Sequence, residues 1–244
     1  MSASDADEEA AGRIAAAVLA VRSRIAHACG LTGRRPQDVT VVAVSKGFGP
    51  EVIEAAIAAD LTDIGENYYQ EAKRKFSAVA WPAHPIRRHF IGRLQRNKLG
   101  RVAALFDVVQ TIDDITAAQA LAGAAASAGK PNLDVLVQLN IASDDRAGVP
   151  PHRCLEFAEQ LGRLRGLRLR GLMAIGPRDP ASVPEAFAVA AKTYNTMRAG
   201  LPHIDWFSLG MSGDMPQAIA AGSTMLRLGA ALFGERPKKE GKML

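Results

Sequence analysis

From about residue 39 onward, short apolar runs rich in β-branched residues alternate with Ala-rich segments of helical periodicity. Strands joined through an intervening helix run parallel to one another, so the alternation predicts a parallel sheet. The expected strands are residues 39–44, 63–64, 88–91, 108–111, 135–139, 169–174, 206–208 and 225–227. Eight strand–helix units are the count of a (β/α)8 TIM barrel, which is the predicted α/β fold.

The length of 244 residues, 48% of them apolar, is that of a single barrel domain. An extra N-terminal helix is expected from about Asp7 to Cys29, because Ile14, Val18 and Val21 recur at helical spacing. We therefore expect a flexible N-terminus at residues 1–9, the barrel at residues 10–236 and a basic flexible tail at residues 237–244.

The N-terminal segment is acidic and lacks the basic and apolar regions of a signal peptide, and no apolar run approaches membrane-spanning length. Cys29 and Cys154 lie far apart and have no neighbouring His at metal-ligand spacing, so both are expected to be buried, inert thiols. The formal charge of +5 is too modest to indicate nucleic-acid binding. We expect a cytoplasmic protein without a membrane, metal or nucleic-acid partner.

Lys46 follows the first predicted strand, separated from its apolar residues 41–44 by Ser45. Reactive groups of (β/α)8 barrels lie at the C-terminal ends of strands, so this side chain is expected at the barrel mouth. Burial lowers the pKa of a lysine and favours the neutral amine that a Schiff base requires. The alternative is a rim lysine whose ammonium group stays in water.

The last two predicted strands are each followed by a glycine-containing loop, and phosphate sites in this fold usually form there. The first loop contains Ser212 and Gly213, and the second opens a helix at Gly229. Glycines let backbone N–H groups approach an anion, and the hydroxyl of Ser212 adds a further donor. The alternative is that these glycines only form tight turns.

Arg227 ends the eighth predicted strand. A guanidinium there could donate to the pyridine nitrogen of pyridoxal 5′-phosphate (PLP) and keep that nitrogen unprotonated. An unprotonated ring is a poor electron sink, which disfavours the carbanion chemistry of transaminases. The alternative is an ion-paired arginine inside the barrel.

Two other polar residues have two interpretations each. Asn67 follows the second strand and either reaches the cofactor or caps a helix. His89 lies within an apolar run, where a hydrogen-bonded core histidine is expected more often than a base. A basic rim follows the third strand and contains Arg93, Arg96, Lys98 and Arg101. The rim either attracts phosphorylated ligands or is, as we favour, a solvated face.

Taken together, these stretches resemble the pyridoxal phosphate homeostasis protein family, also called PLPBP or YggS-like proteins, over nearly the whole chain. The resemblance lies in residues 42–46, 65–68, 89–95, 171–176 and 207–236. It implies a barrel like the N-terminal domain of alanine racemase, with PLP as its cofactor in a Schiff base on Lys46. The residues expected to bind the cofactor are Lys46, Asn67, Met211, Ser212, Arg227, Gly229 and Ala230.

The resemblance also implies a role in balancing the PLP pool, by buffering the cofactor or delivering it to PLP-dependent apoenzymes, without established catalytic turnover. No catalytic residue is predicted. The sequence departs from the family pattern at residues 47–50, at Arg93 and Arg96, and at Ala230, where a serine is common. The last change removes one hydroxyl that could contact phosphate.

A PLP-dependent amino-acid racemase is the alternative function. Racemisation requires two bases that flank the substrate α-carbon, and Lys46 supplies only one. In the racemases the second base is a tyrosine from a β-rich C-terminal domain, whereas this sequence has no such domain and no tyrosine after Tyr194. That difference favours the carrier function.

Overall fold

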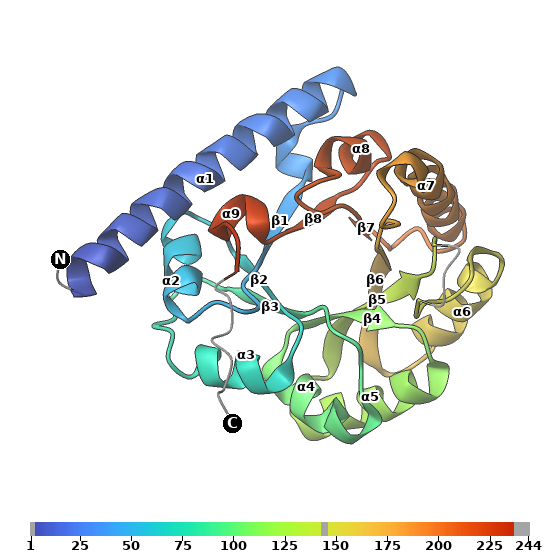
Figure 1. Cartoon of the computed structure of the whole chain (residues 1–244). Coiled ribbons are helices and arrows are strands. Elements are labelled where there is room, and N and C mark those ends of the chain that lie inside the picture. Colours follow the sequence, from blue (N-terminus) through green and yellow to red (C-terminus); the bar gives the residue numbers. More distant parts are fainter. Residues whose placement is uncertain (1–2, 143–145, 237–244) are drawn as a thin grey trace, which may run out of the picture.

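The computed structural model describes residues 3–142 and 146–236, which form a closed barrel of eight parallel strands in sequence order (Figure 1). The strands are β1 (Thr40–Val44), β2 (Asp63–Glu66), β3 (Arg87–Phe90), β4 (Val108–Ile112), β5 (Asn132–Leu139), β6 (Gly166–Ala174), β7 (Trp206–Ser208) and β8 (Met225–Leu228). The predicted (β/α)8 barrel is confirmed, and each expected strand overlaps an observed one.

The helices surround the barrel (Figure 1). They are α1 (Ala3–Leu31), α2 (Glu51–Ala58), α3 (Tyr69–Phe76), α4 (Leu99–Leu105), α5 (Ile115–Ser127), α6 (Cys154–Gly162), α7 (Val183–Gly200), α8 (Met215–Ala220) and α9 (Ala230–Phe233). Short 3-10 turns occupy Pro36–Asp38, Arg96–Lys98, Pro151–Arg153 and Pro180–Ser182.

The barrel closes where β1 pairs in parallel with β8, with Val42 opposite Arg227. Because all eight strands are parallel, their C-terminal ends lie at the same face of the barrel, and the loops that follow them form one mouth. This closure brings the loop after the first strand beside the loop after the last one.

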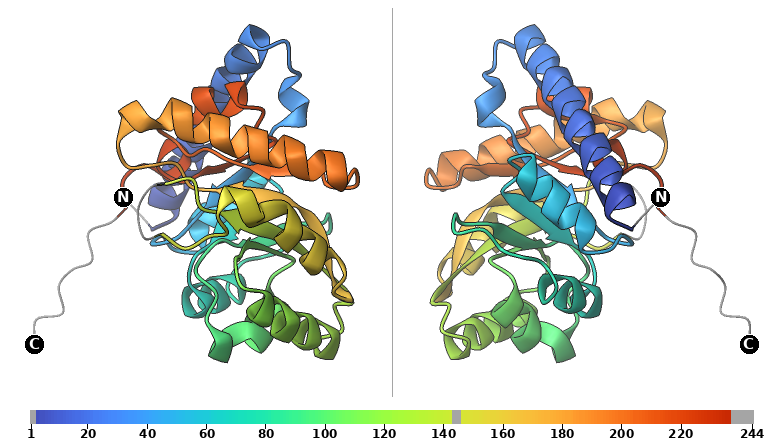
Figure 2. Two further views of the ribbon diagram at one scale, coloured as in Figure 1. Left: turned by 90° about the vertical axis from the view of Figure 1, so that its right-hand side faces the viewer. Right: turned by 90° about the vertical axis from the view of Figure 1, so that its left-hand side faces the viewer.

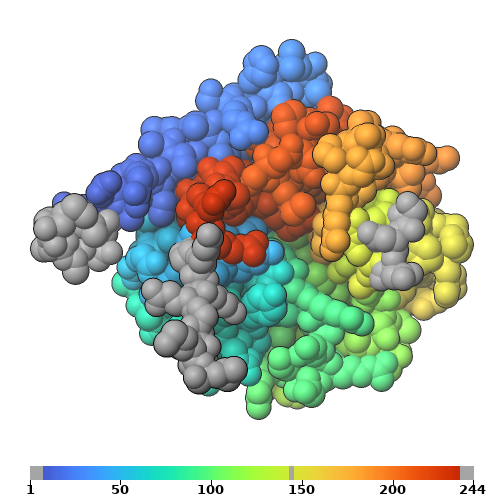
Figure 3. Space-filling model, viewed as in Figure 1, coloured from blue at the N-terminus to red at the C-terminus, as the bar shows by residue number. Residues whose placement is uncertain are grey.

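Helix α1 is the predicted extra helix, and it lies along the flank of the barrel (Figures 1 and 2). In the space-filling view it lies beside the C-terminal segments coloured red (Figure 3). Ile14, Val18, Val21 and Ile25 form its buried face, as their spacing predicts. The helix starts at Ala3, before the expected start, and so runs through most of residues 1–9. The flexibility expected at residues 1–9 stays a prediction, and the tail 237–244 lies outside the described residues.

By length and composition alone, Glu8–Leu31 of α1 could cross a membrane, with a mean hydropathy of 1.4. This finding corrects the expectation that no apolar stretch approaches that length. It is weak evidence, because a helix packed on a protein core passes the same test, and α1 packs against α2, α8 and α9. The expected lack of a membrane partner stays a prediction.

The apolar core has two layers. One fills the space between the strands and the helices, and the other fills the barrel interior with Val42, Val108, Leu136 and Trp206 among its members. Both cysteines are free and buried, as predicted. Burial raises the pKa of Cys154 to about 12, so that thiol stays protonated and unreactive at neutral pH.

The packing of α1 generates a stability prediction. We expect Ile25→Ala to lower the free energy of unfolding by about 2–4 kcal/mol, because the truncation leaves a cavity between α1 and the barrel. Leu19→Ala is the matched control on the same helix: its side chain is 66% exposed, so a change within about 0.5 kcal/mol is expected. Urea unfolding followed by circular dichroism measures both, and equal effects would contradict the described packing.

Candidate functional site

A cavity of about 570 Å³ lies at the C-terminal mouth of the barrel. Its walls come from the ends of β1, β2, β3, β6 and β8 and from the loops after β7 and β8. The seven residues predicted to bind a cofactor all line it: Lys46, Asn67, Met211, Ser212, Arg227, Gly229 and Ala230. Residues spread over most of the sequence therefore meet in one place.

Lys46 is half-buried, and within the described residues its amine makes no hydrogen bond or ion pair. Burial lowers its pKa, and the positive charges of Arg236 and Arg227 lower it further. Glu66 and Glu71 act in the opposite direction without reversing the shift. The direction agrees with the predicted reactive lysine, because a lowered pKa raises the neutral fraction of the amine at neutral pH.

Two side chains of helix α3 bind the backbone of the turn that carries Lys46. Lys75 donates to the carbonyl oxygen of Ser45 at 2.7 Å and pairs with Glu71 at 3.0 Å. Glu71 accepts the backbone N–H of Gly47 at 2.5 Å, and Gly47 adopts a φ of +85° that suits glycine. The turn is therefore fixed on both sides of Lys46.

Glu66, at the end of β2, completes this support. Its carboxylate accepts the hydroxyl of Ser45 at 2.5 Å and pairs with Lys75, whose side chain is completely buried. Burial raises the pKa of Glu66, and the neighbouring ammonium of Lys75 opposes that shift. Because a buried charge without its partner costs several kcal/mol, the pair restricts the turn to one arrangement.

Arg227 is buried inside the barrel and points its guanidinium at uncharged partners. It donates to the carbonyl and hydroxyl oxygens of Ser208 at 2.9 and 2.7 Å and to the carbonyl of Ala174 at 2.8 Å. Burial lowers its pKa to about 10, which leaves it charged at neutral pH. The alternative of an ion-paired arginine is wrong, because these contacts contain no carboxylate.

The two glycine loops meet at the start of α9. The hydroxyl oxygen of Ser212 accepts the N–H of Ala231 at 3.1 Å, which joins the loop after β7 to the loop after β8. A Cβ on Gly229 would stand 3.2 Å from the carbonyl oxygen of Val44, so the chain passes close to β1 there. The amide of Ala230 begins the helix and has no intrahelical acceptor, which leaves it available to an anion.

The backbone at Asn67 packs closely against the backbone at Gly92. A Cβ on Gly92 would lie 1.9 Å from the carbonyl oxygen of Asn67, so only glycine permits this loop path. The side-chain oxygen Oδ1 of Asn67 is buried and has no hydrogen-bond partner in the described chain. The alternative that Asn67 caps a helix is wrong, since Tyr68 occupies the N-cap position of α3.

His89 and the basic rim lie outside this cavity. His89 is fully buried and hydrogen-bonded to Asp63 and Gln110, so the interpretation as a core histidine is confirmed. Arg96 is exposed and pairs with Asp114 at 3.4 Å, as on a solvated face. Arg93 lines a neighbouring cavity of about 260 Å³, and any attraction of phosphorylated ligands stays a prediction.

Several residues contribute to the site without having been predicted from the sequence. Arg236 lies over the lysine turn, with its Cδ 3.1 Å from where a Cβ of Gly47 would stand. Phe48 and Ile175 add apolar wall. The position of Glu66 next to Asn67 at a strand end was a usable signal, whereas nothing local marks Lys75 or Arg236.

The closed barrel and the lysine that follows β1 define the class of barrel proteins related to the N-terminal domain of alanine racemase. The family model described as "Alanine racemase, N-terminal domain" matches residues 20–237. Two curated relatives, from Vibrio alginolyticus and Escherichia coli K12, carry the name pyridoxal phosphate homeostasis protein. The first is 44% identical over 84% of this chain and 89% of its own, and the second 40% identical over 88% and 94%.

A solved structure of PipY from Synechococcus elongatus, with PLP bound, has the same fold with a TM-score of 0.78 and 30% identity. The match covers 91% of this chain and 100% of PipY. The chain belongs to the pyridoxal phosphate homeostasis protein family.

The charges around Lys46 generate a prediction that requires no cofactor. Arg236→Gln removes one of the two cations that lower the pKa of Lys46, so its reaction with formaldehyde and a borohydride reagent should shift to higher pH by a few tenths of a unit. Peptide mass spectrometry of Lys46 across a pH series measures the shift. Arg236→Lys keeps the charge and should restore the original profile, and high salt should reduce the difference. An identical profile for Arg236→Gln would refute the electrostatic influence of Arg236.

Proposed function

We propose that this protein binds PLP as a Schiff base on Lys46 and buffers or delivers the cofactor in the cytoplasm. The observation that carries the proposal is the meeting of a half-buried amine, which makes no hydrogen bond or ion pair within the described residues, with two glycine-containing loops and a buried arginine in one cavity. Membership of the pyridoxal phosphate homeostasis family and the PLP bound to PipY support it.

The residues present fit PLP chemically. PLP supplies an aldehyde that condenses with an amine, a phosphate group and a pyridine nitrogen. Lys46 would provide the amine, and the amide of Ala230 with the hydroxyl of Ser212 would hold the phosphate at the start of α9. Arg227 would donate to the pyridine nitrogen, and the unpaired Oδ1 of Asn67 would accept a hydrogen bond inside the cavity.

The replacement of a serine by Ala230 costs little in this arrangement. The hydroxyl oxygen of Ser212 already accepts the N–H of Ala231, and its own proton remains free for an anion. The backbone N–H of Ala230 is independent of the side chain. Phosphate binding would therefore rest on backbone donors and on Ser212.

The cavity supports a carrier better than a racemase. Of the described residues that line it, Lys46 and Glu235 have side chains that can act as a base, and neither the tyrosine that the racemases use as second base nor a histidine is among them. Lys46 alone is enough to bind and release the aldehyde, whereas racemisation also requires a second base on the opposite face of the substrate. Recipients would be PLP-dependent apoenzymes.

Covalent binding is tested by absorbance and by borohydride reduction followed by peptide mapping. We expect a visible band near about 420 nm after PLP is added, and a pyridoxyl group on Lys46 after reduction. Lys46→Ala should keep the circular dichroism spectrum and melting temperature of the wild type within a few degrees, because Lys46 is only half-buried and makes no hydrogen bond or ion pair within the described residues. It should lose the band and the adduct. An adduct on another lysine would refute the assignment.

Delivery is tested by mixing the PLP-loaded protein with a PLP-dependent apoenzyme in the presence of an excess of an aldehyde scavenger. We expect the apoenzyme to regain activity with loaded protein but not with an equal amount of free PLP, because the cavity shields the aldehyde. Arg236→Lys serves as a loaded control with the same charge. Equal protection by loaded serum albumin would show non-specific shielding and would contradict delivery.

A further inference from the structure

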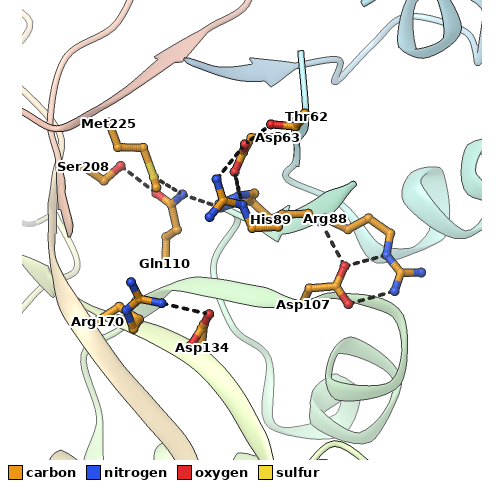
Figure 4. Close-up of polar contacts among 11 residues, drawn as sticks. Thr62, Asp63, Arg88, His89, Asp107, Gln110, Asp134, Arg170, Ser208 and Met225 are labelled. Carbon is orange, nitrogen blue, oxygen red and sulfur yellow. Dashed lines mark hydrogen bonds and ion pairs between the residues drawn. The ribbon is translucent and has the colours of Figure 1, made fainter. Parts of the chain in front are cut away.

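A continuous hydrogen-bond chain crosses the barrel interior and ends at Arg227. The guanidinium of Arg227 contacts the hydroxyl of Ser208 at 2.7 Å, and that hydroxyl contacts Oε1 of Gln110 at 2.8 Å. The amide nitrogen of Gln110 lies 2.9 Å from Nδ1 of His89, and Nε2 of His89 lies 2.8 Å from Asp63. Figure 4 shows the part from Ser208 to Asp63, in which Gln110 bridges strands on opposite sides.

The two ends of the chain determine its direction. An arginine only donates, so the hydroxyl of Ser208 accepts from Arg227 and donates its own hydrogen to Oε1 of Gln110. The amide NH₂ of Gln110 then faces His89, whose Nδ1 must accept. The remaining proton of His89 sits on Nε2 and is donated to the carboxylate of Asp63, which only accepts. Every bond therefore runs from the buried cation toward the buried anion.

The hydrogen-bond chain lies in a buried, largely apolar environment. Asp63, His89, Gln110 and Ser208 are each at most 1% exposed, and the barrel interior around them is apolar, with Val108 among its members. Electrostatic interactions are stronger in such a medium, and an unpaired polar group costs more.

The far end of the chain is anchored at Asp63. Burial acts to raise the pKa of this carboxyl, but hydrogen bonds from His89 and Arg87, together with the positive charge of Arg87, outweigh burial and leave the pKa below its usual value. Asp63 is therefore a carboxylate at neutral pH. Arg227 forms no ion pair within the described residues, and the charge of Asp214 acts to raise its pKa against burial.

We propose that Gln110 and His89 are positioning residues for Arg227: the directed hydrogen-bond chain to Asp63 orients its guanidinium toward the cofactor cavity. The inference rests on the proposed PLP function only for its effect on binding. Neither residue lines the cavity, so both act through Ser208 and Arg227 rather than by touching a ligand.

The direction of the chain is tested on the wild-type protein without PLP. Nitrogen-15 NMR of histidine-labelled protein distinguishes a protonated from an unprotonated ring nitrogen, and comparison with His89→Asn assigns the signals among the 5 histidines. We expect one protonated nitrogen, Nε2, and one unprotonated nitrogen, Nδ1, in His89. A proton on Nδ1 would overturn the proposed direction.

The effect on the site is tested with Gln110→Leu and a matched control, Val108→Ala. Both positions lie on β4 and are fully buried, but Val108 belongs to the apolar interior and takes no part in the chain. We expect Gln110→Leu to weaken PLP binding about tenfold and to shift the visible band. Without Gln110, the hydroxyl of Ser208 loses its acceptor and no longer holds the guanidinium of Arg227 in one orientation. Val108→Ala should lower the melting temperature and leave affinity and spectrum unchanged.

A double variant separates coupling from general damage. If Ser208 and Gln110 act through the same chain, Ser208→Ala combined with Gln110→Leu should weaken PLP binding no more than the stronger single variant. Wild-type affinity and spectrum in Gln110→Leu, or additive losses in the double variant, would overturn the proposal. Failure of the wild type to form an adduct on Lys46 would instead refute the proposed function, while the NMR result would still decide the direction of the chain.

Discussion

The parallel pairing of β1 with β8 is the contact on which the rest of the site depends. It places Val42 opposite Arg227 and closes the sheet, so residues from the two ends of the sequence face one interior. Without closure, the loop that carries Lys46 and the loops around Ser212 and Gly229 would lie on opposite edges of an open sheet. Closure also excludes water from the interior, which strengthens each polar interaction there.

Two groups of buried polar residues position the site in different ways. Lys75, Glu66 and Glu71 hold the backbone on both sides of Lys46, while the chain from Arg227 to Asp63 crosses the lumen. Apolar residues of similar volume would often stabilise a core as well as such groups do. One group ends on Ser45 and Gly47, which flank Lys46, and the other ends on Arg227, so both fix the position of a residue that lines the cavity.

The environment of Lys46 suits a reversible carrier. Burial and nearby cations lower the pKa of the amine, while the turn beneath it is rigid. The flanking wall contributes apolar contact from Phe48 and Ile175, and no tyrosine or histidine is among its described residues. Such a site favours formation of a covalent bond with an aldehyde and offers little for onward proton transfer.

The sequence by itself determined the barrel, the strand positions, the buried face of α1 and the candidate residues Lys46 and Arg227, because periodicity and strand ends are local properties. It did not decide whether Asn67 caps a helix or lines the cavity. It also did not indicate the roles of Arg236 and Lys75 or the partners of His89. Only the tertiary structure decided these, because they depend on the stagger of strands around a closed barrel. That stagger sets which inward side chains meet across the lumen, and no local pattern encodes it.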